Sequence, residues 1–235
     1  MFGEEHPETA ESYHKLGVTQ HSLSDYTGAL ESNNRALDIR IKLFREEHPK
    51  TVDSYHSVGV TQHCLSDYTA ALESAKRAFH IRIKLFGEEH PKTADSYHSV
   101  GVTQHSLSDY TAVLESAKRA LHIRIKLFGE ENPETADSYH LVGVTQRSLS
   151  DYTAAIEYGK RALNIRIKFF GEEHPKTADS YHELEVTRHS LSDSTTALDS
   201  AKRALYIRIK LFGEEHPKSA DSYHELGVTQ HSLSD

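Results

Sequence analysis

The sequence predicts an all-α fold, a solenoid of stacked antiparallel helix hairpins. The first observation behind this prediction is a 42-residue repeat, marked by the six prolines of the chain: Pro7, Pro49, Pro91, Pro133, Pro175 and Pro217. The second is near-identity of the copies, since residues 43–84 and 85–126 differ at only five positions. The third is that apolar residues follow helical spacing in every copy, with no strand-like alternation. A fixed period in this range indicates one supersecondary unit stacked on copies of itself.

The period divides the chain into a single array. The expected units are residues 1–42, 43–84, 85–126, 127–168 and 169–210, followed by a half unit at 211–235. Each unit should contact only its neighbours, so the hydrophobic core is spread along the array. The chain opens inside a connector and stops halfway through a unit, without the polar capping repeat that solenoids usually need. We therefore expect it to be a fragment of a longer protein.

The first half of each unit is predicted to form a helix, named helix A. In the central copy it runs from about residue 91 to residue 107. Pro91 suits the first helical position, where a missing N–H group costs nothing. The apolar residues that follow are spaced to lie on one helix face: Tyr97, Val100, Gly101 and Leu107. Six A helices are expected, one beginning at each proline.

The second half of each unit is predicted to form helix B, at about residues 110–128 in the central copy. Asp109 is expected to cap its N-terminus, and Gly129 to end it with a left-handed residue. Its predicted inner face comprises Tyr110, Val113, Leu114, Ala117, Ala120, Leu121, Ile125 and Phe128. Five B helices are expected, and each pairs with the A helix before it as an αα-hairpin.

Two copies depart from this pattern. Arg45 replaces the glycine that should end the first B helix. In the fifth copy, Glu185 replaces the glycine at position 101 of the central copy. A glutamate cannot reproduce the close backbone approach that glycine allows, so we expect the fifth hairpin to be the loosest, by roughly 1–3 kcal/mol.

The order Tyr97, Val100-Gly101, Tyr110, Ala120-Leu121 resembles the tetratricopeptide repeat. The 42-residue period, with GEEHPKTADSYHSVG and KRALHIRIK, resembles the kinesin-light-chain type in particular. The same repeat type also occurs in nephrocystin-3-like proteins and in nucleotide-binding immune-type receptors. The resemblance covers the whole chain, and it implies a right-handed superhelix with A helices lining the concave wall and B helices outside. The coiled-coil heptads that join a kinesin light chain to its motor are absent.

Several residues depart from the usual pattern of that family. Gln104 and Ala117 stand where bulky aromatic residues are frequent, Ser108 stands where glycine is usual, and His98 stands where asparagine is common. These departures leave the fold assignment intact and weaken any assignment to one particular family member.

The resemblance implies that one face of helix A looks into the groove, and this face carries a repeated His–Val–His stripe. Residues spaced by four and three share a helix face. The stripe comprises His14, Val18, His21; His56, Val60, His63; His98, Val102, His105; His140, Val144, Arg147; His182, Val186, His189; and His224, Val228, His231, with Asp95 beside it. Such a wall suits an extended or helical peptide, acidic if the histidines are charged. The alternative is that these are ordinary solvated residues multiplied by duplication.

The histidines raise two further possibilities. Two imidazoles seven residues apart on a helix lie about 10 Å apart, too far to share a zinc ion, so no metal site is expected. A pH switch is more plausible, because protonation near the reference pKa of about 6.5 would charge the whole groove.

Charge and composition argue against nucleic acid or membrane as a partner and indicate the compartment. A net charge of -8 does not favour nucleic acid or an anionic membrane as a partner. The repeated cations of helix B are expected to form a solvated, salt-bridged outer face: Lys76, Arg77, Arg82, Lys84; Lys118, Arg119, Arg124, Lys126; Lys160, Arg161, Arg166, Lys168; and Lys202, Arg203, Arg208, Lys210. A single cysteine, Cys64, indicates a reducing compartment, so we expect a cytoplasmic protein.

The sequence indicates a scaffold without catalytic activity or cofactor. It contains no phosphate-binding loop and no catalytic motif, and each polar residue recurs in nearly every copy, whereas a catalytic set is normally unique. The leading hypothesis is capture of a partner protein or peptide in the groove. The alternatives are a ligand-sensing repeat segment of a larger nucleotide-binding signalling protein, a kinesin-light-chain-like cargo adaptor, and a structural spacer with no specific ligand.

Overall fold

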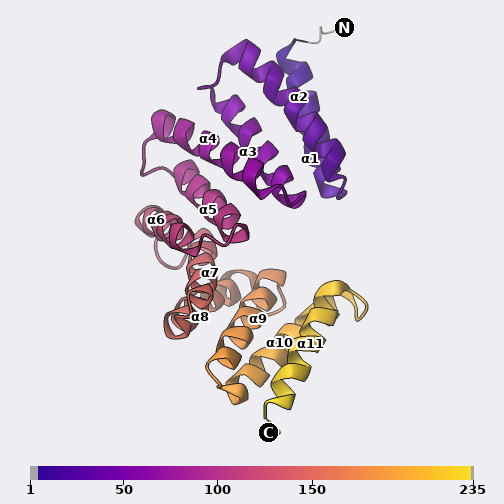
Figure 1. The fold of residues 1–235 in the computed structure, drawn as a ribbon, viewed down its shortest axis with the longest axis vertical. Coiled ribbons are helices and arrows are strands. Elements are labelled where there is room, and N and C mark those ends of the chain that lie inside the picture. The colour runs from indigo at the N-terminus through magenta and orange to yellow at the C-terminus, as the bar shows by residue number, and fades with distance from the viewer. Residues whose placement is uncertain (1–4, 234–235) are drawn as a thin grey trace. The chain divides into compact units, whose positions relative to one another are not determined.

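The computed structural model describes residues 5–233, and within them it contains eleven α-helices and no strand (Figure 1). The predicted A helices are α1 (Pro7–Ser22), α3 (Pro49–Cys64), α5 (Pro91–Ser106), α7 (Pro133–Ser148), α9 (Pro175–Ser190) and α11 (Pro217–His231). The predicted B helices are α2 (Tyr26–Phe44), α4 (Tyr68–Phe86), α6 (Tyr110–Phe128), α8 (Tyr152–Phe170) and α10 (Ser194–Phe212). No helix in this part of the chain combines the length and the apolar character needed to cross a membrane.

The chain divides into two compact units, Met1–Ile123 and Arg124–Asp235. In the first unit, α1 packs on α2, α2 on α3, α3 on α4 and α4 on α5. In the second unit, α7 packs on α8, α8 on α9, α9 on α10 and α10 on α11. Each of these helices therefore contacts its neighbours in sequence, and the predicted all-α fold of stacked helix hairpins is confirmed.

The predicted starts of the B helices are confirmed. At Asp109, the carboxylate accepts a hydrogen bond from the backbone N–H of Ala112, at 3.3 Å. The aspartates Asp25, Asp67, Asp151 and Asp193 make the same contact in the other copies.

Every A helix except α7 begins at a histidine that the sequence did not single out, and α7 begins at Asn132. His90 caps α5 by accepting a hydrogen bond from the backbone N–H of Lys92, at 3.1 Å. Its ring also stacks on Phe86, with ring centroids 4.6 Å apart. The phenylalanine that ends each B helix therefore lies at the connector, and the prediction that Phe128 faces inward is wrong: it is 38% exposed. Leu107, placed on the inner face of helix A, is the C-terminal cap of α5 and is also exposed.

The core lies between successive hairpins. In the first compact unit, one buried cluster contains Leu37 of α2, Val52 and Tyr55 of α3, and Ile81 of α4. The helices of a hairpin approach closely where glycine faces alanine. A Cβ atom on Gly59 would lie 3.3 Å from the carbonyl oxygen of Ala71, which is tighter than a usual contact.

The B helices end in a backbone conformation that suits glycine. Gly87, Gly129, Gly171 and Gly213 have φ between 83° and 86°, as predicted for Gly129. At the end of α2 the same conformation is adopted by Arg45, with φ 69° and ψ 174°. This region is occupied almost only by glycine, because a Cβ atom is strained there.

We expect Arg45→Gly to raise the free energy of unfolding by about 1 kcal/mol. Relief of backbone strain outweighs the extra conformational freedom that glycine gives the unfolded chain. The measurement is urea unfolding followed by circular dichroism. Arg45→Ala is the control, because it removes the side chain but keeps the Cβ atom; equal stabilisation by the alanine variant would contradict the strain argument.

Candidate functional site

Two adjoining pockets in the first unit lie between consecutive A helices. The pocket between α3 and α5 has a volume of about 240 Å³. Its lining comprises His56, Gly59, Val60, His63, Cys64, Ala75, His98, Ser99, Val102 and Thr103. The pocket between α1 and α3 has a volume of about 190 Å³ and is lined by Gly17, Val18, His21, Ser22, Asn33, His56, Ser57, Val60 and Thr61. Because His56 and Val60 line both, the pockets form one continuous strip along the A helices.

In α1 and α3, the valine of the stripe is exposed while both histidines are half-buried. Val18 is 51% exposed and Val60 is 38% exposed. Val102 and Val144 are half-buried at the same position of α5 and α7. The valine position therefore supplies the apolar surface of the strip.

In α1, α3 and α9, the second histidine of the stripe contacts the C-terminal end of the next A helix. The Nε2 atom of His63 lies 2.9 Å from the hydroxyl oxygen of Ser106, and the same distance separates His189 from Ser232. His21 meets the Cys64 sulfur at 3.5 Å. The rings of His21, His63 and His105 also pack at about 5 Å against the tyrosine that starts the following B helix. These contacts give the second histidine a structural role, whatever else it does.

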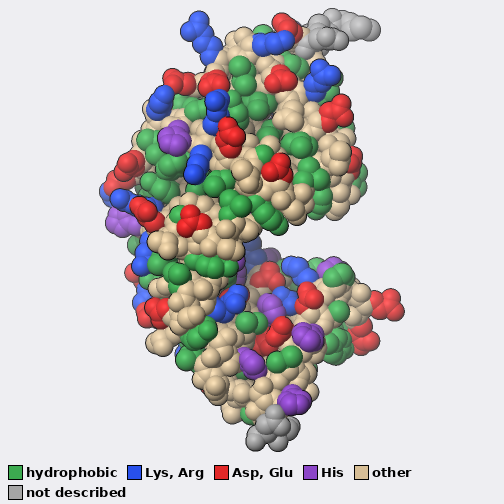
Figure 2. All heavy atoms as spheres, in the orientation of Figure 1, with side chains coloured by type: hydrophobic (Ala, Val, Ile, Leu, Met, Phe, Trp, Pro, Cys, Tyr) green, Lys and Arg blue, Asp and Glu red, His purple; other side chains and the backbone are tan. Residues whose placement is uncertain are grey.

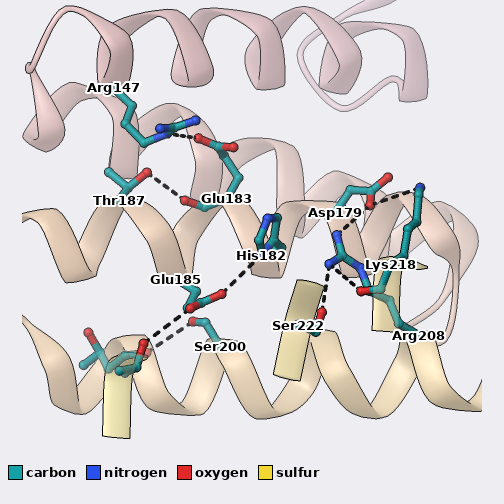
Figure 3. Close-up of polar contacts among 12 residues, drawn as sticks. Arg147, Asp179, His182, Glu183, Glu185, Thr187, Ser200, Arg208, Lys218 and Ser222 are labelled. Carbon is teal, nitrogen blue, oxygen red and sulfur yellow. Dashed lines mark hydrogen bonds and ion pairs between the residues drawn. The ribbon is translucent and has the colours of Figure 1, made fainter. Parts of the chain in front are cut away.

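Arg147 takes the place of this histidine in α7. It forms an ion pair with Glu183 of α9, and both side chains are largely buried (Figure 3). The α7–α9 contact therefore includes a charge pair, where His63 and His189 meet a serine hydroxyl group and His21 meets the Cys64 sulfur.

The first histidine of the stripe is half-buried in α1, α3, α5, α7 and α9 and exposed in α11, and burial changes its titration. Burial is the main cause that lowers the pKa of His14 and His56, and the guanidinium groups of Arg40 and Arg82 lower it further. Burial likewise lowers the pKa of His63. The largest effect is at His140, where burial lowers the pKa to about 4. The expectation that the stripe histidines titrate near pH 6.5 is wrong for these four, which stay neutral at pH 7.

A buried arginine recurs in every B helix. Arg40, Arg82, Arg124, Arg166 and Arg208 are 3–5% exposed. In each, Nη1 donates to a backbone carbonyl ten residues on and to a serine hydroxyl fourteen residues on; the serines are Ser54, Ser96, Ser138, Ser180 and Ser222. The prediction of a solvated outer ridge is therefore wrong for Arg82, Arg124, Arg166 and Arg208.

The same arginines reach back to the preceding A helix. Arg208 of α10 lies 3.2 Å from Asp179 of α9 and 2.8 Å from Ser222 of α11 (Figure 3). Glu11, Asp53 and Asp137 pair in the same way with Arg40, Arg82 and Arg166. Asp95, predicted to line the groove, is half-buried at the equivalent position of α5. In the copies whose ion pairs are described, this position joins the two helices of one hairpin.

The sequence contains a signal for this burial. Arg124 follows Ala117, Ala120 and Leu121 by seven, four and three residues, so it shares their buried helix face. The other cations of helix B behave as predicted where their ion pairs are described: Arg77 with Glu46, Lys84 with Glu47, Lys168 with Glu131 and Lys210 with Glu173. On the face shown in Figure 2, charges of both signs are interspersed, and histidines gather over α9 and α11.

Glu185 is buried where other copies have glycine. Its carboxylate lies 3.3 Å from the hydroxyl oxygen of Thr229 in α11 and 3.3 Å from Nδ1 of His182 in α9 (Figure 3). The site is thus rebuilt with polar partners instead of close backbone contact. That the fifth hairpin is the loosest stays a prediction.

Metal ligands do not converge in the described residues. Within residues 5–233, no three histidine, cysteine, aspartate or glutamate side chains lie together as a metal site would require.

Comparison with known families identifies the repeat. The sequence profile of the tetratricopeptide repeat matches residues 21–84, 53–126, 114–168 and 147–208. A comparison with curated proteins finds no match.

Solved structures with the same fold come from several proteins. The nearly identical TPR-like repeats of a candidate kinesin light chain from Podosopora anserina are 22% identical, with a TM-score of 0.73, over 87% of this chain and 97% of that one. BtubC (BKLC) from P. vanneervenii is 20% identical, with a TM-score of 0.74, over 88% and 83%. The apo form of RapI is 18% identical, with a TM-score of 0.71, over 94% and 62%. At these identities, the likeness shows the fold alone.

The resemblance to tetratricopeptide repeats is confirmed by the family profile, and the structures of similar fold include the repeats of a kinesin-light-chain-like protein. The fold supports a protein-interaction scaffold. The chain belongs to the tetratricopeptide repeat family.

Proposed function

We propose that the chain is a non-catalytic scaffold that binds a partner peptide along α1, α3 and α5. The observation that carries the proposal is the continuous strip formed by the two pockets, with Val60 and His56 shared between them. A peptide can place successive side chains in successive pockets, which a single small molecule would not do. As part of the same proposal, the scaffold acts in the cytoplasm, where its exposed Cys64 stays reduced.

The chemistry of the strip defines the class of peptide. Val18 and Val60 offer apolar contact, and the imidazoles offer one hydrogen-bond donor and one acceptor each. Since burial lowers the pKa of His56 and His63, neither ring is charged at pH 7. The proposed ligand is therefore a peptide with apolar side chains at two points, recognised by packing and hydrogen bonds. A preference for acidic peptides is expected only after the histidines are protonated.

We expect Val60→Glu to weaken peptide binding at least about tenfold, or 1.4 kcal/mol. A carboxylate at this position would lie in both pockets and oppose apolar contact. Peptides are first selected from a random library displayed on phage, using the 235-residue chain as bait. Their affinity for each variant is then measured by fluorescence anisotropy.

Leu85→Glu is the matched control. Leu85 is 37% exposed, like Val60 at 38%, but it lies near the end of α4, outside both pockets. Equal loss of binding in the two variants, or failure to select any peptide, would remove the case for this site.

A further inference from the structure

The A helices of the second compact unit repeat those of the first. A shift of three repeats relates α7, α9 and α11 to α1, α3 and α5. Of the nine residues that line the pocket between α1 and α3, six are identical after this shift. Of the ten residues that line the pocket between α3 and α5, seven are identical. The second unit therefore contains most of the residues that form the binding strip of the first.

Six lining positions differ between the two units. Three of them have a glutamate in the second unit and a small residue in the first: Glu183 for Ser57, Glu185 for Gly59, and Glu225 for Ser99. The other three differences are Arg147 for His21, Gly159 for Asn33, and Ser190 for Cys64. The glutamates add volume and charge at positions where serine or glycine leaves space.

The first glutamate of α9 lies between α7 and α9. The carboxylate of Glu183 pairs with the guanidinium group of Arg147, and the two side chains are 16% and 29% exposed (Figure 3). In the first unit the same two positions are His21 and Ser57, and both line an open pocket. The ion pair thus spans the space that corresponds to this pocket.

The second glutamate of α9 lies between α9 and α11. Glu185 is 1% exposed, and its carboxylate lies 3.3 Å from the hydroxyl oxygen of Thr229. The counterpart of Thr229 in the first unit is Thr103, which lines the open pocket between α3 and α5. The valine between the two spaces is also less accessible: Val186 is half-buried, whereas Val60 is 38% exposed.

A ligand side chain can enter these spaces only by displacing a carboxylate from its partners. Separation of Glu183 from Arg147 would leave two largely buried charges uncompensated. Removal of Glu185 from Thr229 and His182 would leave buried polar groups without a hydrogen bond. Neither cost arises in the first unit, where the corresponding residues are serine and glycine.

We propose that Glu183 and Glu185 close the second copy of the binding strip, so that the chain binds one peptide, on α1, α3 and α5, instead of two. This inference rests on the proposed function. The two glutamates are specificity-determining residues, because they exclude the peptide from a set of A helices that otherwise resembles the binding strip.

An opened variant tests the proposal by giving the second unit the residues of the first: Arg147→His, Glu183→Ser, Glu185→Gly and Glu225→Ser. Isothermal titration calorimetry with a peptide selected on the wild-type chain measures the number of sites. We expect one peptide per wild-type chain and two per opened chain. Lys168→His with Glu131→Ser is the matched control, since it removes an exposed ion pair of the second unit and should leave one site.

Val60→Glu distinguishes failure of this inference from failure of the proposed function. In that background the opened variant should bind with an affinity within about tenfold of the wild-type strip, and adding Val186→Glu at the equivalent position should abolish binding. If Val60→Glu weakens binding to the wild-type chain but the opened variant still binds one peptide, this inference is wrong and the proposed function stands. If Val60→Glu has no effect, both are wrong.

The reverse exchange decides the matter if the opened variant does not fold. His21→Arg with Ser57→Glu places the same ion pair between α1 and α3, and should weaken peptide binding at least about tenfold. Circular dichroism checks that the variant is folded. A folded variant that binds the peptide as tightly as the wild type would overturn the proposal.

Discussion

Replacing Arg166 with alanine is expected to lower the free energy of unfolding by about 3 kcal/mol. The side chain is 4% exposed and donates to the Lys176 carbonyl at 3.0 Å and to the Ser180 hydroxyl at 2.7 Å. It also pairs with Asp137 at 3.0 Å. The alanine variant would leave all three acceptors without this donor, and the loss of a buried partner costs far more than the loss of an exposed one.

Asp137 sets the size of the effect. Desolvation raises the pKa of this carboxyl group, but hydrogen bonds from Lys176 and Arg166 outweigh it and hold the pKa below its usual value. Because Lys176 would remain at 2.7 Å, the carboxylate keeps one cation, and the cost falls at the lower end of the range for buried pairs.

Urea unfolding followed by circular dichroism measures the change. Lys168→Ala is the control, since Lys168 lies on α8 like Arg166 but is exposed. Its ion pair with Glu131 is screened by solvent. Arg166→Lys adds a second test: a lysine keeps the charge but lacks the fork that reaches three acceptors, so it should restore only part of the stability. If Arg166→Ala and Lys168→Ala shifted the unfolding midpoint equally, the buried arginine would not be a main support of the fold.

Acidification from pH 6.5 to 4 is expected to destabilise the chain by about 3 kcal/mol through His140 alone. The pKa of this imidazole is about 4 in the folded chain, because burial disfavours the charged form and Arg166 repels it. The unfolded chain has the ordinary value of 6.5. Between these two pH values the unfolded state binds more protons, so stability is full above pH 6.5 and is lost as the pH falls towards 4.

His140→Gln should flatten this pH dependence, since glutamine cannot be protonated. The measurement is the urea unfolding midpoint at pH 7.0, 6.0, 5.0 and 4.5. His224→Gln, at the exposed copy of the same position in α11, is the matched control. Equal flattening by both variants would show that burial of His140 is not the cause.

The helix boundaries were predictable because their signals are local. Proline starts each A helix, aspartate caps each B helix, and glycine ends every B helix except α2, and each acts on its own backbone or within a few residues. The roles of His90, which caps α5 and stacks on Phe86, were not predictable from the sequence because both depend on the conformation of the connector.

The buried arginines show what periodicity alone misses. Arg124 has the spacing of a core residue, but a charge is normally assigned to the surface. What makes its burial tolerable is a set of acceptors distant in sequence, such as the hydroxyl group of Ser138. Those acceptors are small polar residues of helix A, and their burial follows only from the stacking of one repeat on the next.

The candidate site was predictable in part. Helical spacing placed Val18 and Val60 on one face of their helices, and both line the pockets. The contact between His63 and Ser106 joins neighbouring repeats and depends on how far apart their A helices lie. The lowered pKa of His56 depends on the same packing, because it results from burial and from Arg82 of α4.

The buried arginine also bears on how the array unfolds. Arg208 binds Asp179 within its own hairpin and Ser222 on the first helix of the next repeat, so part of its energy belongs to the junction between repeats. In a one-dimensional array, stability is the sum of an intrinsic term for each unit and a coupling term for each junction. Interactions of this kind enlarge the coupling term, so a 42-residue repeat that unfolds destabilises the repeats beside it. A junction between a folded and an unfolded repeat then costs more free energy. We therefore expect the array to unfold in cooperative segments longer than one 42-residue period.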